Sequence, residues 1–159
     1  MKKILIGSDK SGYELKEAVK AHLVELGYEV EDCGTTNPEN AKGYFVVAPV
    51  AAKKVSGGEY DRAILICGTG MGMAVVANKF PGVYAAVCEN TYAAKKSRAI
   101  NNANVLTMGG WITGAVTGCE IADEFLNTSF TQDLEPWRQE FLKEAFAGVQ
   151  EIEREVYGR

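Results

Sequence analysis

The chain is poor in histidine: its 159 residues include only one, His22. His22 lies within the helical pattern 14–23, far in sequence from every glycine turn, so we expect it on the surface or at a helix end. Most catalytic triads and most zinc sites use histidine. We therefore expect no metal, and any reaction must use thiol, carboxylate, amine, hydroxyl or amide groups.

Paired cysteines and long apolar runs are also missing. The four scattered cysteines include no Cys-x-x-Cys pair; they are Cys33, Cys67, Cys88 and Cys119. This pattern is typical of thiols in a reducing compartment, and all but Cys67 are interpreted as buried structural residues. No apolar run could span a bilayer, and the one after Met1-Lys2-Lys3 is too short for a signal peptide. We expect a cytoplasmic protein with no membrane partner.

An excess of positive charge is absent as well. The chain has 17 Lys and Arg against 21 Asp and Glu, which gives a net charge of −4. No basic stripe stands out, so a nucleic-acid partner is not expected.

The usual nucleotide fingerprints are not present either. Gly7-Ser8-Asp9-Lys10-Ser11-Gly12 lacks the middle glycine of Gly-x-Gly-x-x-Gly, and no Gly-Lys-Ser/Thr loop occurs. These absences argue against a nicotinamide cofactor and against nucleotide hydrolysis.

Apolar strand patterns alternate with helical patterns along residues 1–130. We expect strands within 3–9, 28–33, 63–66, 82–87 and 104–108, and helices over 13–26, 44–55, the segment ending at 77, 91–99 and 112–126. This alternation predicts an α/β domain whose parallel sheet is covered by helices on both faces.

Residues 131–159 form a separate extension. Pro136 opens a helix that runs to about Tyr157 with an apolar stripe. This stripe must be buried somewhere, either on a partner subunit or on the helix's own domain.

The stretch 61–73 carries the strongest chemical signal. A buried strand ends at Cys67, and Gly68-Thr69-Gly70-Met71-Gly72 follows before helical sequence resumes. The glycines let backbone N–H groups converge, and a helix start favours negative charge. We expect the turns at 7–12, 67–72 and 101–104 to meet at one edge of the sheet, with the Cys67 thiol among them.

Five segments in order resemble a known family. They are Gly7-Ser8-Asp9, Glu14-Leu15-Lys16, Ile66-Cys67-Gly68-Thr69-Gly70-Met71-Gly72, Ala77-Asn78-Lys79 and Asn101-Asn102-Ala103-Asn104-Val105-Leu106. The combination is similar to the sugar-phosphate isomerases that include type B ribose-5-phosphate isomerase and galactose-6-phosphate isomerase. The resemblance covers about residues 1–130. It implies a Rossmann-like three-layer α/β/α sandwich with a five-stranded parallel sheet, sites shared in a homodimer or dimer of dimers, and no cofactor.

The resemblance also implies residue roles. Cys67 matches the base that moves a proton between C1 and C2, and Thr69 matches a hydroxyl that relays a proton between the two oxygens. The backbone at Gly68, Gly70, Met71 and Gly72 matches the site that holds the cis-enediolate. Asp9, Tyr44 and Asn101 match residues that contact the sugar.

Three positions and one segment depart from the family pattern. Ile100 stands where ribose-5-phosphate isomerases have the histidine that opens the furanose ring, Lys10 replaces a second histidine, and Trp111 replaces an arginine. The late Gly-Gly-Arg-His-x-x-Arg segment is missing, which leaves Lys10 and Arg138 as candidate anion-binding residues.

The combined hypothesis is an aldose–ketose isomerase with a cysteine base. The missing ring-opening acid favours a short or acyclic substrate, such as an erythrose or erythrulose phosphate, over ribose 5-phosphate. Three alternatives stay open: the isomerase of an unphosphorylated sugar, a non-catalytic sugar-binding subunit of a hetero-oligomeric isomerase, and a nucleotide-binding or redox module that uses Cys67 as a nucleophile.

Overall fold

Five parallel strands form one sheet in the order β2-β1-β3-β5-β4 in the computed structural model, which describes residues 2–158. The strands are β1 (Lys3–Ser8), β2 (Glu29–Asp32), β3 (Ala63–Cys67), β4 (Ala85–Val87) and β5 (Val105–Gly109). The helices are α1 (Tyr13–Glu25), α2 (Tyr44–Ser56), α3 (Met71–Ala77), α4 (Thr91–Ala99), α5 (Ala115–Asn127) and α6 (Pro136–Tyr157), with a short 3₁₀ turn at Pro38–Asn40.

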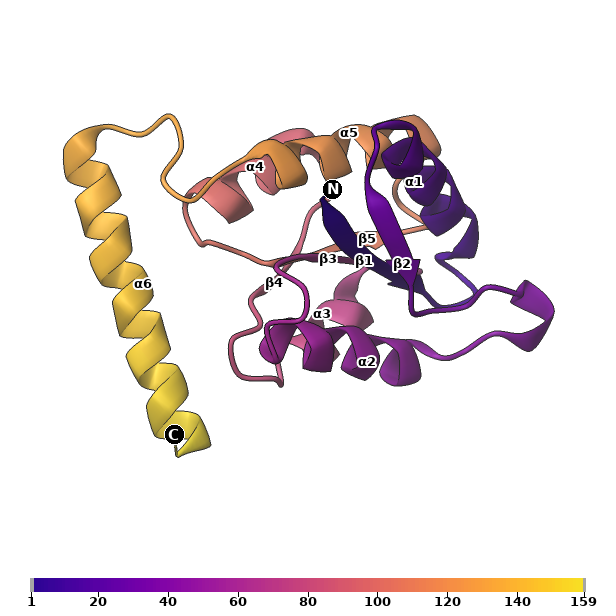
Figure 1. Cartoon of the computed structure of the whole chain (residues 1–159), viewed down its shortest axis with the longest axis horizontal. Helices are drawn as coiled ribbons and strands as arrows, with labels where there is room; N and C mark the ends of the chain where they lie inside the picture. Colours follow the sequence, from indigo (N-terminus) through magenta and orange to yellow (C-terminus); the bar gives the residue numbers. More distant parts are fainter. Residues whose placement is uncertain (1, 159) are drawn as a thin grey trace.

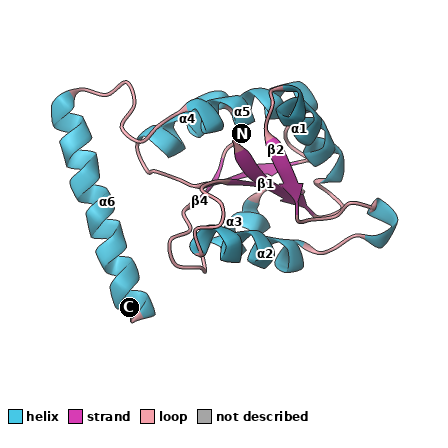
Figure 2. Cartoon of the chain, in the orientation of Figure 1, coloured by secondary structure: helices cyan, strands magenta, loops and turns pink. Residues whose placement is uncertain are grey.

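The sheet lies between two helical layers (Figure 1, Figure 2). Helices α1, α4 and α5 cover one face, and α2 and α3 cover the other. Along β3 the side chains alternate between the layers: Ile64 and Ile66 pack under the first, Leu65 and Cys67 under the second. The predicted three-layer α/β/α sandwich with a five-stranded parallel sheet is confirmed.

Most predicted elements are present with small shifts at their ends. Strand β4 is shorter than the predicted 82–87, because Gly82 has a left-handed φ of 73° and the chain turns there. Helix α5 begins three residues later than predicted, since Gly114 is its extended N-cap. None of the helices described within residues 2–158 is both long and apolar enough to cross a membrane.

Helix α6 crosses the amino-terminal edge of the sheet. The Phe146 ring contacts Tyr84 and Phe130, and Tyr157 donates a hydrogen bond to the Lys79 carbonyl. Leu142 is buried as well, whereas the other apolar side chains of the helix stay exposed, namely Trp137, Phe141, Val149, Ile152 and Val156. Helix α6 therefore packs on its own domain along one side only. Figure 1 shows it standing apart from the two helical layers.

A buried lysine joins α1 to the carboxyl end of β2. The Lys16 side chain is 0% exposed, and its ammonium donates to the Asp32 carboxylate (2.6 Å) and to the Thr35 carbonyl (2.8 Å). Burial opposes the charge on Asp32, but hydrogen bonds from Lys16 and the Gly34 N–H outweigh it and lower the pKa of this carboxyl. The Thr35 N–H donates to the Ser8 carbonyl, so this network holds β2 against the end of β1.

We expect Lys16→Met to destabilise the protein by about 3 kcal/mol at pH 7, because it leaves the buried Asp32 carboxylate without its main partner. Asp32 has a lowered pKa in the folded state, so its stabilising contribution is present above its unfolded pKa and is lost as the pH falls. The difference between wild type and variant should therefore shrink between pH 5 and pH 3. Urea unfolding at several pH values measures this. Lys20→Met, which removes a partly exposed partner of the same carboxylate, is the control and should cost less than about 1 kcal/mol.

Candidate active site

The turn after β3 brings a thiol and backbone donors together. Gly70 adopts a left-handed φ of 78°, which a side chain would disfavour, and it forms the N-cap of α3. This conformation lets the Gly70 N–H donate to the Cys67 sulfur at 3.1 Å. Cys67 is 4% exposed. The turn therefore supplies a buried sulfur with a backbone hydrogen-bond donor.

The predicted enediolate-binding backbone is partly engaged within the turn itself. The Met71 N–H donates to the Thr69 hydroxyl oxygen at 3.3 Å, which leaves the Thr69 O–H as a donor. Within residues 2–158, no acceptor is bound to the N–H groups of Gly68 and Gly72. Both groups therefore remain available to donate to a substrate oxygen.

Trp111 lies directly on the turn that follows β3. A Cβ added at Gly68 would come within 2.8–2.9 Å of three atoms of the indole ring, so the ring rests against the Gly68 backbone. The backbone N–H of Trp111 also donates to the Gly68 carbonyl at 3.0 Å. Trp111 is nevertheless 74% exposed. The indole ring therefore packs on the Gly68 backbone with part of its surface, and most of the side chain stays exposed.

The remaining residues at this edge surround the same turn. Tyr44, at the start of α2, places its ring 3.0 Å from where a Cβ on Gly72 would be. After β1, the Asp9 carboxylate accepts a hydrogen bond from the Gly12 N–H at 3.0 Å and so has a fixed orientation. Lys10 is exposed and forms no ion pair with a described residue. Its charge is free to meet an anionic substrate.

The expectation that three predicted turns meet at one edge is wrong within a single chain. The turns after β1 and β3 do meet, but the turn at 101–104 lies at the opposite edge, because it precedes β5 instead of following it. The Asn104 carbonyl accepts from the Ala63 N–H at the start of β3, whereas Cys67 is its last residue. The two points are about 13 Å apart along the strand. The third turn at the Cys67 edge is 109–111, after β5.

Three predicted site residues lie at this opposite, amino-terminal edge. Ile100 and exposed Asn101 follow the end of α4, and Arg138 is exposed in the first turn of α6. The Thr131 N–H donates to the Ala99 carbonyl, which ties the segment before α6 to the end of α4. Within one chain, these residues therefore lie at the opposite edge of the sheet from Cys67.

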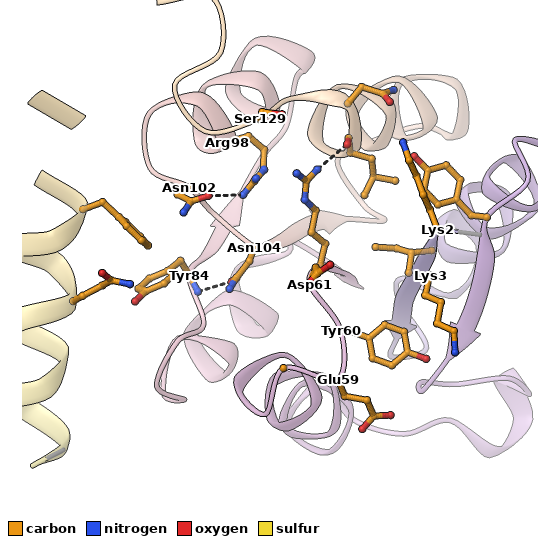
Figure 3. A pocket seen from close by; sticks show the side chains of 18 residues that line it. Lys2, Lys3, Glu59, Tyr60, Asp61, Tyr84, Arg98, Asn102, Asn104 and Ser129 are labelled. Carbon is orange, nitrogen blue, oxygen red and sulfur yellow. Dashed lines mark hydrogen bonds between the residues drawn. The ribbon is translucent and has the colours of Figure 1, made fainter. Parts of the chain in front are cut away.

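A wide pocket of about 1040 Å³ occupies the amino-terminal edge (Figure 3). It is lined by Arg98, Asn102, Asn104 and Tyr84 on one side and by Lys3, Tyr60 and Asp61 on another. It contains none of the predicted catalytic groups. Its lining comes from the amino-terminal edge of the sheet, from the ends of α4 and α5, and from Phe146 and Gln150 of α6.

The other cysteines lie away from the turn. Burial of the Cys33 thiol raises its pKa to about 11, which keeps it protonated at neutral pH. Cys88 is buried as predicted, whereas Cys33 and Cys119 are only partly buried. In the part of the chain that the structure describes, no group of three or more His, Cys, Asp or Glu is placed to hold a metal ion.

Known proteins share this sequence and fold. A model of the family described as Ribose/Galactose Isomerase matches residues 4–146. A 4-deoxy-4-sulfo-D-erythrose isomerase from a Clostridium species is 64% identical over 98% of both chains. Ribose-5-phosphate isomerase B of Escherichia coli is 45% identical over 82% of this chain and 87% of its own.

The fold agrees with these similarities. The structure of Clostridium thermocellum ribose-5-phosphate isomerase B superposes with a TM-score of 0.87 at 39% identity, over 97% of this chain and 99% of that one. The chain therefore belongs to the ribose/galactose isomerase family and is an aldose–ketose isomerase.

Proposed function

We propose that the chain interconverts 4-deoxy-4-sulfo-D-erythrose and the matching ketose, with Cys67 as the base. The observation that carries the mechanism is the Gly70 N–H donated to the Cys67 sulfur. The substrate follows from the 64% identical relative of that name and from the side chains around the turn. The sequence favours a tetrose phosphate. The proposed substrate has the same four-carbon chain, with a sulfonate in place of the phosphate ester.

The chemistry of the substrate suits the altered residues. A tetrose with sulfur on C4 has no C4 hydroxyl, so it cannot close a furanose ring and needs no acid to open one. Ile100, which has no proton to give, is compatible with such a substrate. A sulfonate carries a single negative charge, whereas a phosphate ester approaches two at neutral pH. A site in which Trp111 replaces a family arginine therefore fits the sulfonate better.

Each proton transfer can be assigned to a residue of the turn after β3. The Cys67 thiolate removes the proton from C2 of the aldose, and the electrons move toward O1 to form the cis-enediolate. The free N–H groups of Gly68 and Gly72 donate to the enediolate oxygens. The Thr69 hydroxyl passes the O2 proton to O1, and the Cys67 thiol then returns its proton to C1, which gives the ketose.

A second copy of the chain is needed to complete this site. Ile100, Asn101 and Arg138 lie at the wrong edge of their own sheet, so we assign them to the partner's site in a homodimer. An exposed apolar patch on α2 and α3 surrounds the Cys67 turn and includes Phe45, Met71 and Val75. This patch and the exposed stripe of α6 are the surfaces that the second copy would cover.

Cys67→Ser should lower kcat about 10³-fold without loss of stability, because a hydroxyl is a far weaker base at neutral pH than a thiolate. Turnover of the sulfonated tetrose and exchange of its C2 proton in D₂O, followed by NMR, measure the effect. Cys119→Ser makes the same chemical change on α5 and should keep kcat within about twofold. A Cys67→Ser enzyme with near-normal exchange would rule out the sulfur as the base.

Wild-type kcat/KM should be at least about 100-fold lower for ribose 5-phosphate than for the sulfonated tetrose, because no acid stands at position 100 to open the ring. Ile100→His should raise the value for ribose 5-phosphate, and the size-matched control Ile100→Leu should not. Equal turnover of both sugars by the wild-type enzyme would contradict the acyclic substrate.

A further inference from the structure

Arg98 is a buried cation at the end of α4. It is 6% exposed, and its guanidinium donates to the Asn102 side-chain oxygen (3.1 Å), to the Ala103 carbonyl and to the Thr128 carbonyl (3.2 Å). Figure 3 shows it directed at Asn102 across the base of the amino-terminal pocket. These bonds join the turn that follows Ile100 to the end of α5.

The backbone around Arg98 is conformationally unusual. Three non-glycine residues of the described chain have a positive φ: Asn102 (52°), Thr131 (65°) and Asp133 (58°). All three lie in the two segments that meet at the end of α4, where Lys95 also pairs with Asp133 at 3.0 Å. Such conformations persist only where surrounding contacts enforce them, and they gather at functional sites.

The charge on Arg98 is not used to neutralise an acid. Neither Arg98 nor its neighbour Arg62 forms a salt bridge with a described residue. Burial lowers the pKa of the Arg98 guanidinium to about 10, and the charge of Arg62 adds to this, so the group stays charged at neutral pH. A buried cation bound only to carbonyl and amide oxygens contributes geometry, because its planar fork fixes several acceptors at once.

Arg62 provides a natural comparison. It donates to the carbonyls of Phe125, Leu126 and Thr128, and like Arg98 it lies over the Phe125 ring. Both arginines therefore bind the end of α5. Only Arg98 also binds the turn that contains Asn101.

We propose that Arg98 is a positioning residue, which holds the Ile100–Asn101 turn in the shape that the active site of a second copy requires. This inference rests on the proposed function, in which that turn acts in the partner's site. Arg98 does not touch the substrate. It acts through the backbone of the turn and through its attachment to the segment that leads to Arg138.

The first experiment compares Arg98→Lys with Arg62→Lys in the full-length protein, with 4-deoxy-4-sulfo-D-erythrose as substrate. Lysine keeps the charge but cannot span the Asn102, Ala103 and Thr128 acceptors together. We expect kcat/KM to fall about 100-fold in Arg98→Lys, the scale of a small misplacement of a substrate-contacting group. Arg62→Lys should stay within about twofold of wild type. Urea unfolding of both variants shows whether their stabilities are matched.

The second experiment separates positioning from general damage to the fold. Cys67→Ser and Arg98→Lys are co-expressed with different tags, and the hybrid dimer is purified. One of its two sites combines an intact Cys67 with an intact turn from the other subunit, so the hybrid should recover about half of the wild-type kcat. Each parent dimer should remain slow.

The outcomes distinguish the two proposals. A hybrid no faster than Arg98→Lys, or an equal loss in Arg62→Lys and Arg98→Lys at matched stability, overturns the positioning role alone. A wild-type protein that is active as a monomer contradicts both the shared site and the role of Arg98.

Discussion

The shared direction of the five strands constrains everything else in this protein. In a parallel sheet each turn that follows a strand lies at one edge, and each turn that precedes a strand lies at the other. The turns after β1, β3 and β5 therefore converge on Cys67, while the turn before β5 lies about 13 Å away. No local rearrangement of one chain can close that separation. The site that we propose, built from both edges, therefore takes its residues from two copies.

Much of the fold and the conformation of the turn after β3 could be predicted from the sequence, because their signals are local. The apolar run that ends at Cys67 and the glycines after it specify both a buried strand and its turn. The amide chemistry of Asn101 does not indicate at which edge of the sheet this residue lies. Its place before a strand does, because a turn that precedes a parallel strand lies at the amino-terminal edge. The contact between Trp111 and Gly68, and the burial of Lys16, depend on residues distant in sequence and leave no periodic pattern.

Cations in this protein serve two different purposes. Lys16 and Arg98 are almost fully buried, and each binds several acceptors that join separate elements of the chain. Lys10 and Arg138 are exposed and keep their charges available. The first pair fixes geometry, and only the second pair is suited to meet an anion. Loss of the family's other anion-binding positions thus leaves the framework of the fold intact.

The contact between Trp111 and Gly68 has a consequence for how substrate preference changes during evolution. Glycine at position 68 is required by the close approach of the indole ring, but nothing about glycine requires tryptophan at position 111. The dependence runs in one direction only. Position 111 can therefore accept side chains of different size and charge while the backbone of the turn after β3 stays the same. Under the proposed function, one substitution just after β5 would change the surface that faces the sugar and leave the groups proposed for proton transfer in place.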